Sequence, residues 1–133
     1  MLYFAYGSNL NHFQMKMRCK DSIFLKKISL NNFKLTFRSK YRAADIEPQK
    51  GSILEGGLYE ISKIDELKLD VYEDYPILYT KLYFLYEDKK IMTYMMTRKT
   101  PFRYPYEKYL NIIKKGYKDC GCNWSHLKKA LKN

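Results

Sequence analysis

The chain has 133 residues, of which 46% are hydrophobic and 29% are charged. This is the composition of one ordinary globular domain, and it excludes a disordered chain. No apolar run approaches the roughly 20 residues that span a bilayer, and the first residues lack the basic flank and cleavage pattern of a signal peptide. We therefore expect a single domain over residues 1–133, located in the cytoplasm, that folds without a cofactor.

The formal net charge is +11, from 25 Lys and Arg against 14 Asp and Glu. Such a field attracts phosphates, acidic lipids or anionic substrates. The lysines are scattered from Lys16 to Lys132, whereas a nucleic-acid-binding protein usually clusters its basic residues on one face. RNA or DNA binding is therefore the less favoured interpretation, and we expect no membrane partner.

The first half of the chain combines β-prone runs with one short helix. Asn11 is the expected N-cap of this helix, with Phe13, Met15 and Met17 along its apolar side. Residues 38–50 are polar, contain a proline and are expected to form a loop. The β-prone runs are residues 2–6, 22–31, 33–37 and 51–61.

The second half begins with a helix and ends with two more. Ser62 is the expected N-cap of a helix of about ten residues whose apolar face is Ile64, Leu67 and Val71, and Pro76 follows its end. A hairpin of residues 78–86 and 91–97 comes next, and the last helices run from 105 to 121 and from 123 to 131. The pattern predicts an α+β fold with six or seven short strands, in a small mixed β-barrel or strongly curved sheet with flanking helices.

A glycine turn at the end of the first predicted strand is one candidate site. Tyr6-Gly7-Ser8-Asn9-Leu10 combines a residue without a Cβ atom with short polar side chains, and successive N–H groups in such a turn bind anions. The alternative is a simple strand-to-helix turn capped by Ser or Asn.

Glu73 is the second candidate. It is surrounded in the sequence by Tyr72, Tyr75, Pro76 and Tyr79, and partial desolvation among these rings raises the pKa of a carboxyl group toward the range useful for proton transfer. The alternative is a solvent-facing acid at a helix end, because the neighbouring aspartates are equally acidic.

Three cysteines are an odd number in a chain with no export signal, so we do not expect a disulfide framework. Cys120 and Cys122 with His126, completed by Cys19 or His12, offer ligands of the kind that zinc accepts. The C-x-C-x₃-H spacing matches no common zinc motif, and three ordinary thiols account for the pattern, so we expect no metal.

Several segments together resemble the γ-glutamylcyclotransferase-like family, which includes the AIG2-like proteins. The matching segments are YGSNL at 6–10, GGLYEIS at 56–62, LDVYE at 69–73, YPILY at 75–79 and PYEKYLNIIKKG at 105–116. The resemblance runs in order from residue 2 to about residue 121. Each segment is short, but their shared order makes chance agreement improbable.

The resemblance implies a small mixed barrel that catalyses an intramolecular acyl transfer. The α-amine of a γ-glutamyl compound attacks its own γ-carbonyl, which releases 5-oxoproline and a free amine without a metal or cofactor. Many relatives have glycine after the catalytic glutamate, whereas this chain has Asp74, which raises the pKa of Glu73 or alters the turn. The implied roles are a substrate loop of Tyr6, Gly7, Ser8, Asn9 and Leu10, Glu73 as acid/base, and Tyr79 and Tyr109 as further pocket residues.

Three functions remain open at this stage. The first is a cyclotransferase, monomeric or homodimeric, whose partner is a small γ-glutamyl molecule. The second is a catalytically silent domain of the same fold that binds a small ligand or a partner, and the third is a basic nucleic-acid-binding module. The leaving group, whether an amino acid, an amine, glutathione or a biosynthetic intermediate, is not specified by the sequence, although residues 38–50 and 98–104 are expected to shape that side of the pocket.

Overall fold

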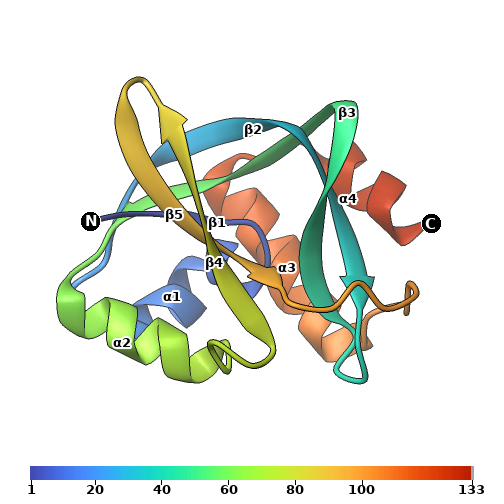
Figure 1. The fold of residues 1–133 in the computed structure, drawn as a ribbon, viewed down its shortest axis with the longest axis horizontal. Helices are drawn as coiled ribbons and strands as arrows, with labels where there is room; N and C mark the ends of the chain where they lie inside the picture. Colours follow the sequence, from blue (N-terminus) through green and yellow to red (C-terminus); the bar gives the residue numbers. More distant parts are fainter. Residues whose placement is uncertain (133) are drawn as a thin grey trace.

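A five-stranded mixed sheet forms the centre of the computed structural model, which describes residues 1–132 (Figure 1). The strand order is β2-β3-β1-β5-β4, with β1 antiparallel to β3 and parallel to β5. The sheet curves strongly but does not close into a barrel, since β2 and β4 remain its two edges. The strands are β1 (Leu2–Ala5), β2 (Ile23–Arg38), β3 (Ala43–Glu60), β4 (Tyr79–Tyr86) and β5 (Lys89–Met96).

The prediction of six or seven short strands was wrong in number, because two strands are long. The runs 22–31 and 33–37 join into β2, where Asn32 has a φ of 64° and the pairing shifts register between Asn31 and Phe33. Such a bulge bends a strand without ending it. The polar segment 38–50, expected as a loop, contributes residues 43–50 to β3, because main-chain pairing with β2 does not need apolar side chains.

Four predicted capping residues mark helix ends, whereas the third helix begins at Glu107 and not at residue 105 as expected. The Asn11 side chain caps the first helix, Ser62 forms a reciprocal capping box with Asp65, Gly121 ends the third helix at a φ of 74°, and Asn123 caps the last. None of the helices among residues 1–132 is long and apolar enough to cross a membrane. The helices are α1 (His12–Arg18), α2 (Lys63–Tyr72), α3 (Glu107–Cys120) and α4 (Trp124–Leu131), with a 3₁₀ turn η1 (Ser8–Leu10) before α1.

The predicted apolar faces of α1 and α2 were largely wrong. Met15 of α1 is fully buried, but the other residues assigned to these faces project into solvent. The exposed residues are Phe13, Met17, Ile64, Leu67 and Val71.

The inner face of α2 carries acids instead. Leu69 is fully buried there, beside the buried Glu66. Lys81 of β4 accounts for this orientation, because its ammonium group lies 2.9 Å from the Glu66 carboxylate and 3.0 Å from that of Asp70. Buried carboxylates are tolerated when they are paired, so the pairing with a lysine on a distant strand allows this acidic face of α2 to turn inward.

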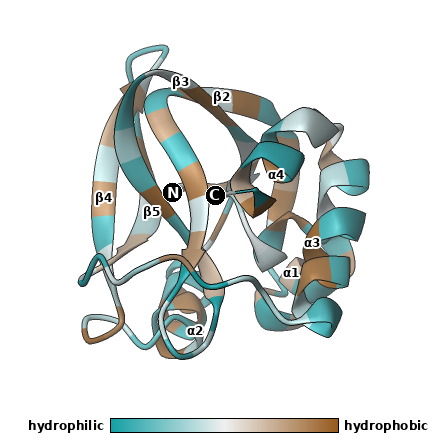
Figure 2. Ribbon diagram, turned by 90° about the vertical axis from the view of Figure 1, so that its right-hand side faces the viewer, coloured by the Kyte–Doolittle hydropathy of each residue, from teal (hydrophilic) through white to brown (hydrophobic). Residues whose placement is uncertain are grey.

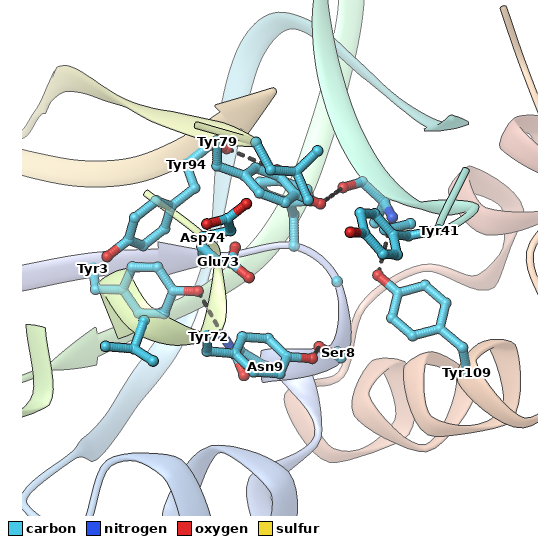
Figure 3. Close-up of a pocket in the computed structure, with 16 residues that line it drawn as sticks. Tyr3, Ser8, Asn9, Tyr41, Tyr72, Glu73, Asp74, Tyr79, Tyr94 and Tyr109 are labelled. Carbon is cyan, nitrogen blue, oxygen red and sulfur yellow. Dashed lines mark hydrogen bonds between the residues drawn. The ribbon is translucent and has the colours of Figure 1, made fainter. Parts of the chain in front are cut away.

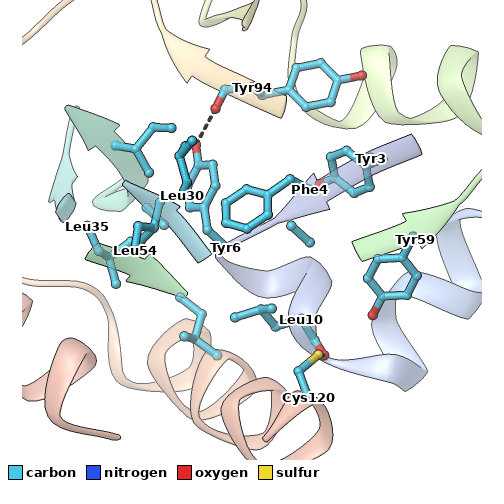
Figure 4. Close-up of a cluster of buried hydrophobic side chains, with 14 of the residues drawn as sticks. Tyr3, Phe4, Tyr6, Leu10, Leu30, Leu35, Leu54, Tyr59, Tyr94 and Cys120 are labelled. Carbon is cyan, nitrogen blue, oxygen red and sulfur yellow. Dashed lines mark hydrogen bonds between the residues drawn. The ribbon is translucent and has the colours of Figure 1, made fainter. Parts of the chain in front are cut away.

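Helix α3 holds η1 in place from the side of the molecule opposite the β4–β5 hairpin (Figure 2). The two elements approach closely at Gly116, where an added Cβ atom would come within 2.6 Å of the Asn11 nitrogen and of the Leu10 Cβ atom. Leu10 is fully buried in the same core (Figure 4), and the Cys120 thiol contacts its carbonyl at 3.3 Å. The end of β1 is therefore fixed by close packing.

The cysteines and histidines that were considered as zinc ligands do not lie together. Cys120 lies 3.5 Å from the His12 ring, whereas Cys19 contacts a main-chain carbonyl of α2 and His126 lies beside Glu55. Within residues 1–132 no three His, Cys, Asp or Glu side chains are grouped as metal ligands would be. Burial raises the pKa of each of the three thiols to about 12, so they remain protonated at neutral pH.

Candidate active site

A cavity of about 500 Å³ opens where β1 runs into η1 and where α2 ends (Figure 3). Its volume is in the range typical of small-molecule sites. All but one of the residues expected at the site line it, namely Tyr6, Gly7, Ser8, Asn9, Glu73, Tyr79 and Tyr109. Segments from both ends of the chain therefore meet at one place.

Leu10 is the exception. Its side chain is fully buried in the hydrophobic core behind the loop and does not line the cavity. The N–H group of Leu10 donates to the Gly7 carbonyl at 3.0 Å and closes the turn. Leu10 thus anchors the loop, and we assign it no contact with a ligand.

Gly7 lies in a closely packed part of the loop. A Cβ atom at this position would lie 3.1 Å from the Ala44 Cβ atom and 3.6 Å from the Tyr109 hydroxyl. The absent side chain leaves room for the loop to lie against β3 at the cavity wall.

The side chain of Asn9 is hydrogen-bonded to protein partners at both ends of its amide. Its Nδ2 atom donates to the Tyr3 hydroxyl at 3.0 Å, and its Oδ1 atom accepts from Arg18 at 2.7 Å. Its main-chain carbonyl accepts from the Tyr59 hydroxyl at 2.9 Å. Asn9 therefore stabilises the loop through all of these groups and leaves its main-chain N–H for a ligand.

Two main-chain donors of the loop have no partner within the turn. The Ser8 and Asn9 N–H groups are the first of η1, and the opening N–H groups of a helical turn lack acceptors inside it. The Ser8 hydroxyl is held by the Tyr72 hydroxyl at 3.0 Å. Adjacent free N–H groups of this kind stabilise an anionic oxygen.

Glu73 terminates α2 on the opposite wall. Its N–H donates to the Leu69 carbonyl at 2.8 Å, and the chain then turns through Asp74 at a φ of 52°. Figure 3 shows the Glu73 carboxyl group among the rings of Tyr3, Tyr79 and Tyr94. Within residues 1–132 this carboxyl group has no hydrogen-bond partner.

Burial raises the pKa of Glu73 to about 8, and the positive charge of Arg18 partly opposes this effect. The physical cause is the loss of hydration of the charged form, which no hydrogen bond replaces. A carboxyl group with this pKa exchanges a proton near neutral pH, as a general acid/base must. The expectation of a desolvated glutamate is supported, and Tyr75 and Pro76, which were expected beside it, do not line the cavity.

Two tyrosines retain a hydrogen-bond donor for a ligand. Tyr6 and Tyr79 donate to main-chain carbonyls at 2.7 and 2.6 Å, so their hydroxyl hydrogens are used. Tyr3 and Tyr109 accept bonds, from the Asn9 amide and the Ala44 N–H, both at 3.0 Å. Since a hydroxyl both donates and accepts, the hydrogens of Tyr3 and Tyr109 are left without an acceptor among residues 1–132. Burial raises the pKa of both hydroxyls, which keeps them neutral donors.

The lining of the cavity is aromatic and acidic. Glu73 and Asp74 are its charged members, and no Lys, Arg or His is among the described residues that line it. Residues 38–50 contribute Tyr41, Ala43 and Ala44, as expected, whereas residues 98–104 contribute none. The positive net charge of the chain therefore lies outside the cavity.

The family model for gamma-glutamyl cyclotransferase, AIG2-like, matches residues 3–116. The chain belongs to this family. No curated protein matches the sequence at a significant level.

Solved structures support the same assignment. A gamma-glutamyl cyclotransferase has a TM-score of 0.79 at 26% identity, with 99% of this chain and 86% of that chain covered. A Homo sapiens protein described as uncharacterized has a TM-score of 0.78 at 26% identity, with 98% and 85% covered. YkqA from Bacillus subtilis has a TM-score of 0.80 at 21% identity, with 100% and 54% covered, and shows the fold alone.

The departure of this family member at Asp74 has a conformational explanation. A φ of 52° is left-handed backbone, which favours glycine and which aspartate tolerates better than most residues. The groups that shift the pKa of Glu73 are its surroundings and Arg18, and Asp74 is not one of them. Of the two roles considered for Asp74, the geometry supports the one in the turn.

Three residues of the site were not predicted from the sequence. Tyr3 and Tyr94 line the cavity, and Arg18 holds Asn9 from behind. Tyr3 and Tyr94 meet because β1 pairs in parallel with β5, a pairing between residues about 90 positions apart that no local pattern indicates. In a chain with 14 tyrosines, residue type alone gave no signal.

Proposed function

We propose that the protein is a γ-glutamyl cyclotransferase that converts a γ-glutamyl amine into 5-oxoproline and a free amine. The observation that carries the proposal is the Glu73 carboxyl group, which is partly buried, has no hydrogen-bond partner among residues 1–132 and has a pKa raised to about 8. It faces a cavity whose opposite wall carries the free N–H groups of Ser8 and Asn9. Membership of the family supports the same reaction.

The proposed reaction begins with a proton transfer to Glu73. The α-ammonium group of the substrate gives one proton to the Glu73 carboxylate, and the resulting amine attacks the γ-carbonyl carbon to form a C–N bond. The carbonyl oxygen becomes an oxyanion, which the loop N–H groups are suited to stabilise. Glu73 then returns that proton to the leaving nitrogen as the oxyanion re-forms the carbonyl and the original amide C–N bond breaks. The second proton of the ring nitrogen passes to the Glu73 carboxylate and from there to the released amine. The nucleophile is part of the substrate, so no Ser or Cys nucleophile is needed.

The raised pKa of Glu73 fits both halves of this cycle. A carboxyl group of pKa about 8 is largely protonated at pH 7 in the free protein. A bound α-ammonium group favours the carboxylate, because an opposite charge within a few ångströms lowers the pKa of an acid. Substrate binding thereby generates the base, and the carboxyl group regains its proton affinity once the amine is neutral.

The charge of the cavity restricts the leaving group. Glu73 and Asp74 line the cavity without a basic side chain among the described residues, so a leaving portion with its own carboxylate finds no cationic partner in the lining and is opposed by the acid at position 74. The seven tyrosines of the lining favour an apolar or cationic portion instead. We propose γ-glutamyl compounds of uncharged or cationic amines as better substrates than γ-glutamyl amino acids or glutathione.

The test is release of 5-oxoproline from a panel of γ-glutamyl amines, γ-glutamyl amino acids and glutathione. Glu73→Gln preserves the shape of the side chain and removes its titration, and we expect it to lower turnover by roughly 10²- to 10⁴-fold. Asp74→Asn is the matched control, because it neutralises the adjacent acid of the same cavity, and it should retain most of the turnover.

Each alternative result has a definite meaning. Turnover by Glu73→Gln at the wild-type rate would exclude Glu73 as the acid/base. Preference for glutathione would reject the inferred leaving group and leave the reaction intact. Silence across the panel, combined with stabilisation of the protein by 5-oxoproline in a thermal-shift assay, would support a silent ligand-binding domain.

A further inference from the structure

Arg18 lies behind the cavity, in the last turn of α1, and contacts both of its walls. Its guanidinium group donates to Asn9 Oδ1 at 2.7 Å and to Gln14 Oε1 at 2.8 Å. The same planar group lies over the ring of Tyr72, 3.8 Å from the ring centroid. One side chain thus contacts the substrate loop through Asn9 and the end of α2 through Tyr72.

Each of these contacts continues toward the reacting groups. The Asn9 amide, with its oxygen bound by Arg18, donates from its nitrogen to Tyr3 at 3.0 Å. Tyr72 bonds the Ser8 hydroxyl at 3.0 Å and immediately precedes Glu73 in the chain. The planar fork of an arginine suits this arrangement, because it donates two bonds in fixed directions while its face stacks on a ring. A lysine cannot do all three.

We propose that Arg18 is a positioning residue that joins the substrate loop to the end of α2 and so fixes the Ser8 and Asn9 N–H groups relative to the Glu73 carboxyl group. This inference rests on the proposed function for its kinetic consequence, but the geometric link it describes does not. Arg18 is not among the residues that line the cavity, so it acts through Asn9 and Tyr72 and not on the substrate.

Its charge has a second effect on the same site. Arg18 lowers the pKa of Glu73, against the effect of burial, and loss of the cation should therefore move the titration of Glu73 to higher pH. The acids Glu66 and Asp70 on α2 are already paired with Lys81. The groups facing this region are Arg18 of α1, Asp70 of α2, Asp74 of the following turn, Lys81 of β4, and the hydroxyls of Tyr3, Tyr6, Tyr79, Tyr94 and Tyr109.

The experiment compares Arg18→Gln and Arg18→Lys with the wild type on the best substrate of the γ-glutamyl panel. We expect Arg18→Gln to lower kcat/KM roughly 10- to 100-fold, because a small displacement of catalytic groups is costly, and to move the acidic limb of the kcat/KM profile to higher pH. In Arg18→Lys the acidic limb of the kcat/KM profile should return to its wild-type pH, because its position depends on the positive charge. The value of kcat/KM should recover only in part, because it depends on the two directed hydrogen bonds of the guanidinium group. Lys20→Gln, at an exposed position near the same helix end, is the control for a loss of net charge and should change neither quantity.

A second measurement separates this inference from the proposed function. The titration of Glu73 in the free protein, followed by ¹³C NMR of its carboxyl carbon, requires no turnover and should move to higher pH in Arg18→Gln. An active enzyme in which Arg18→Gln changes neither kcat/KM nor the titration would overturn the inference and leave the proposed function in place. A shifted titration in a protein that turns over no γ-glutamyl compound would refute the proposed function and support the action of the Arg18 charge on Glu73. Should Arg18→Gln fail to fold, Arg18→Lys alone decides, since a wild-type kcat/KM there would exclude a role for the fork.

Discussion

The two walls of the cavity differ in whether their polar side chains are hydrogen-bonded to the protein. On the loop of residues 6–10, the Ser8 hydroxyl and both ends of the Asn9 amide are hydrogen-bonded to protein partners. On the opposite wall, the Glu73 carboxyl group has no hydrogen-bond partner within residues 1–132. The loop is thus held by its side chains, whereas Glu73 is held by the main chain at the end of α2.

The difference separates rigidity from reactivity. A hydrogen-bonded side chain is fixed but has little capacity left for a ligand, and the loop accordingly offers main-chain N–H groups to the cavity. An unpaired and partly buried carboxyl group is costly for the folded protein, but its proton affinity rises into the useful range. In the function that we propose, the paired groups position the substrate and the unpaired group moves the proton.

The largest expected effect concerns the cost of leaving Glu73 unpaired. Its pKa is about 8 in the folded protein against about 4.3 in an unfolded chain, so the folded state binds the proton more tightly. The contribution of Glu73 to stability is therefore most favourable below the pKa of the unfolded chain. It is lost as the pH rises through the pKa of the folded protein. We expect Glu73→Gln to be more stable than the wild type by roughly 2–4 kcal/mol above pH 8, after allowance for water in the cavity.

Urea unfolding of the wild type and Glu73→Gln at pH 5 and pH 9 measures this difference. The gap in the free energy of unfolding should be small at pH 5 and open as the pH rises. A gap that is the same at both pH values would mean that Glu73 has an ordinary pKa and that the two walls do not differ as described.

The next effect tests the rigidity of the loop wall. Gly116→Ala forces a Cβ atom to within 2.6 Å of the main chain at Asn11, and overpacking of this kind typically costs about 1–3 kcal/mol. Because the displaced element is η1, kcat/KM should fall as well. Lys118→Ala, at an exposed position of the same helix, is the matched control for thermal unfolding and kinetics. A Gly116→Ala variant as stable as the wild type would show that the loop moves to accommodate the added Cβ atom at little cost in free energy.

A smaller effect is expected from one hydrogen bond to the loop. Tyr59→Phe removes the donor to the Asn9 carbonyl, and an unsatisfied buried carbonyl costs about 1–2 kcal/mol. Urea unfolding measures the loss, and Tyr83→Phe on the exposed part of β4 serves as the control. An equal loss in both variants would indicate a general effect of the missing hydroxyl and no special role for Asn9.

The smallest effect is expected at Asp74. Asp74→Gly relieves left-handed backbone at a φ of 52°, and the change in the free energy of unfolding should be under about 1 kcal/mol, since glycine also gains entropy in the unfolded chain. The acidic limb of the pH-rate profile should not move. Asp88→Gly, at a φ of 64° in the β4–β5 turn, is the control for the backbone effect. A shifted limb in Asp74→Gly would mean that Asp74 does influence the titration of Glu73.

The amino-acid sequence determined the local features of this protein. Asn11, Ser62 and Asn123 mark helix starts, and Gly121 marks a helix end, because capping depends on a residue and its near neighbours. Residues 6–10 and Glu73 were also identified from the sequence, because they lie in short motifs that follow one another in a fixed order.

The tertiary structure decided which faces are buried and which residues surround the cavity. The spacing of Ile64, Leu67 and Val71 predicted a buried stripe, yet Lys81 draws the acids of α2 inward and leaves that stripe exposed. A periodic pattern shows that residues share a face, but the partner across the interface decides where the face points. Arg18 likewise reaches Tyr72 only because α1 and α2 lie together, and a contact between segments so distant in the chain leaves no local pattern in the sequence.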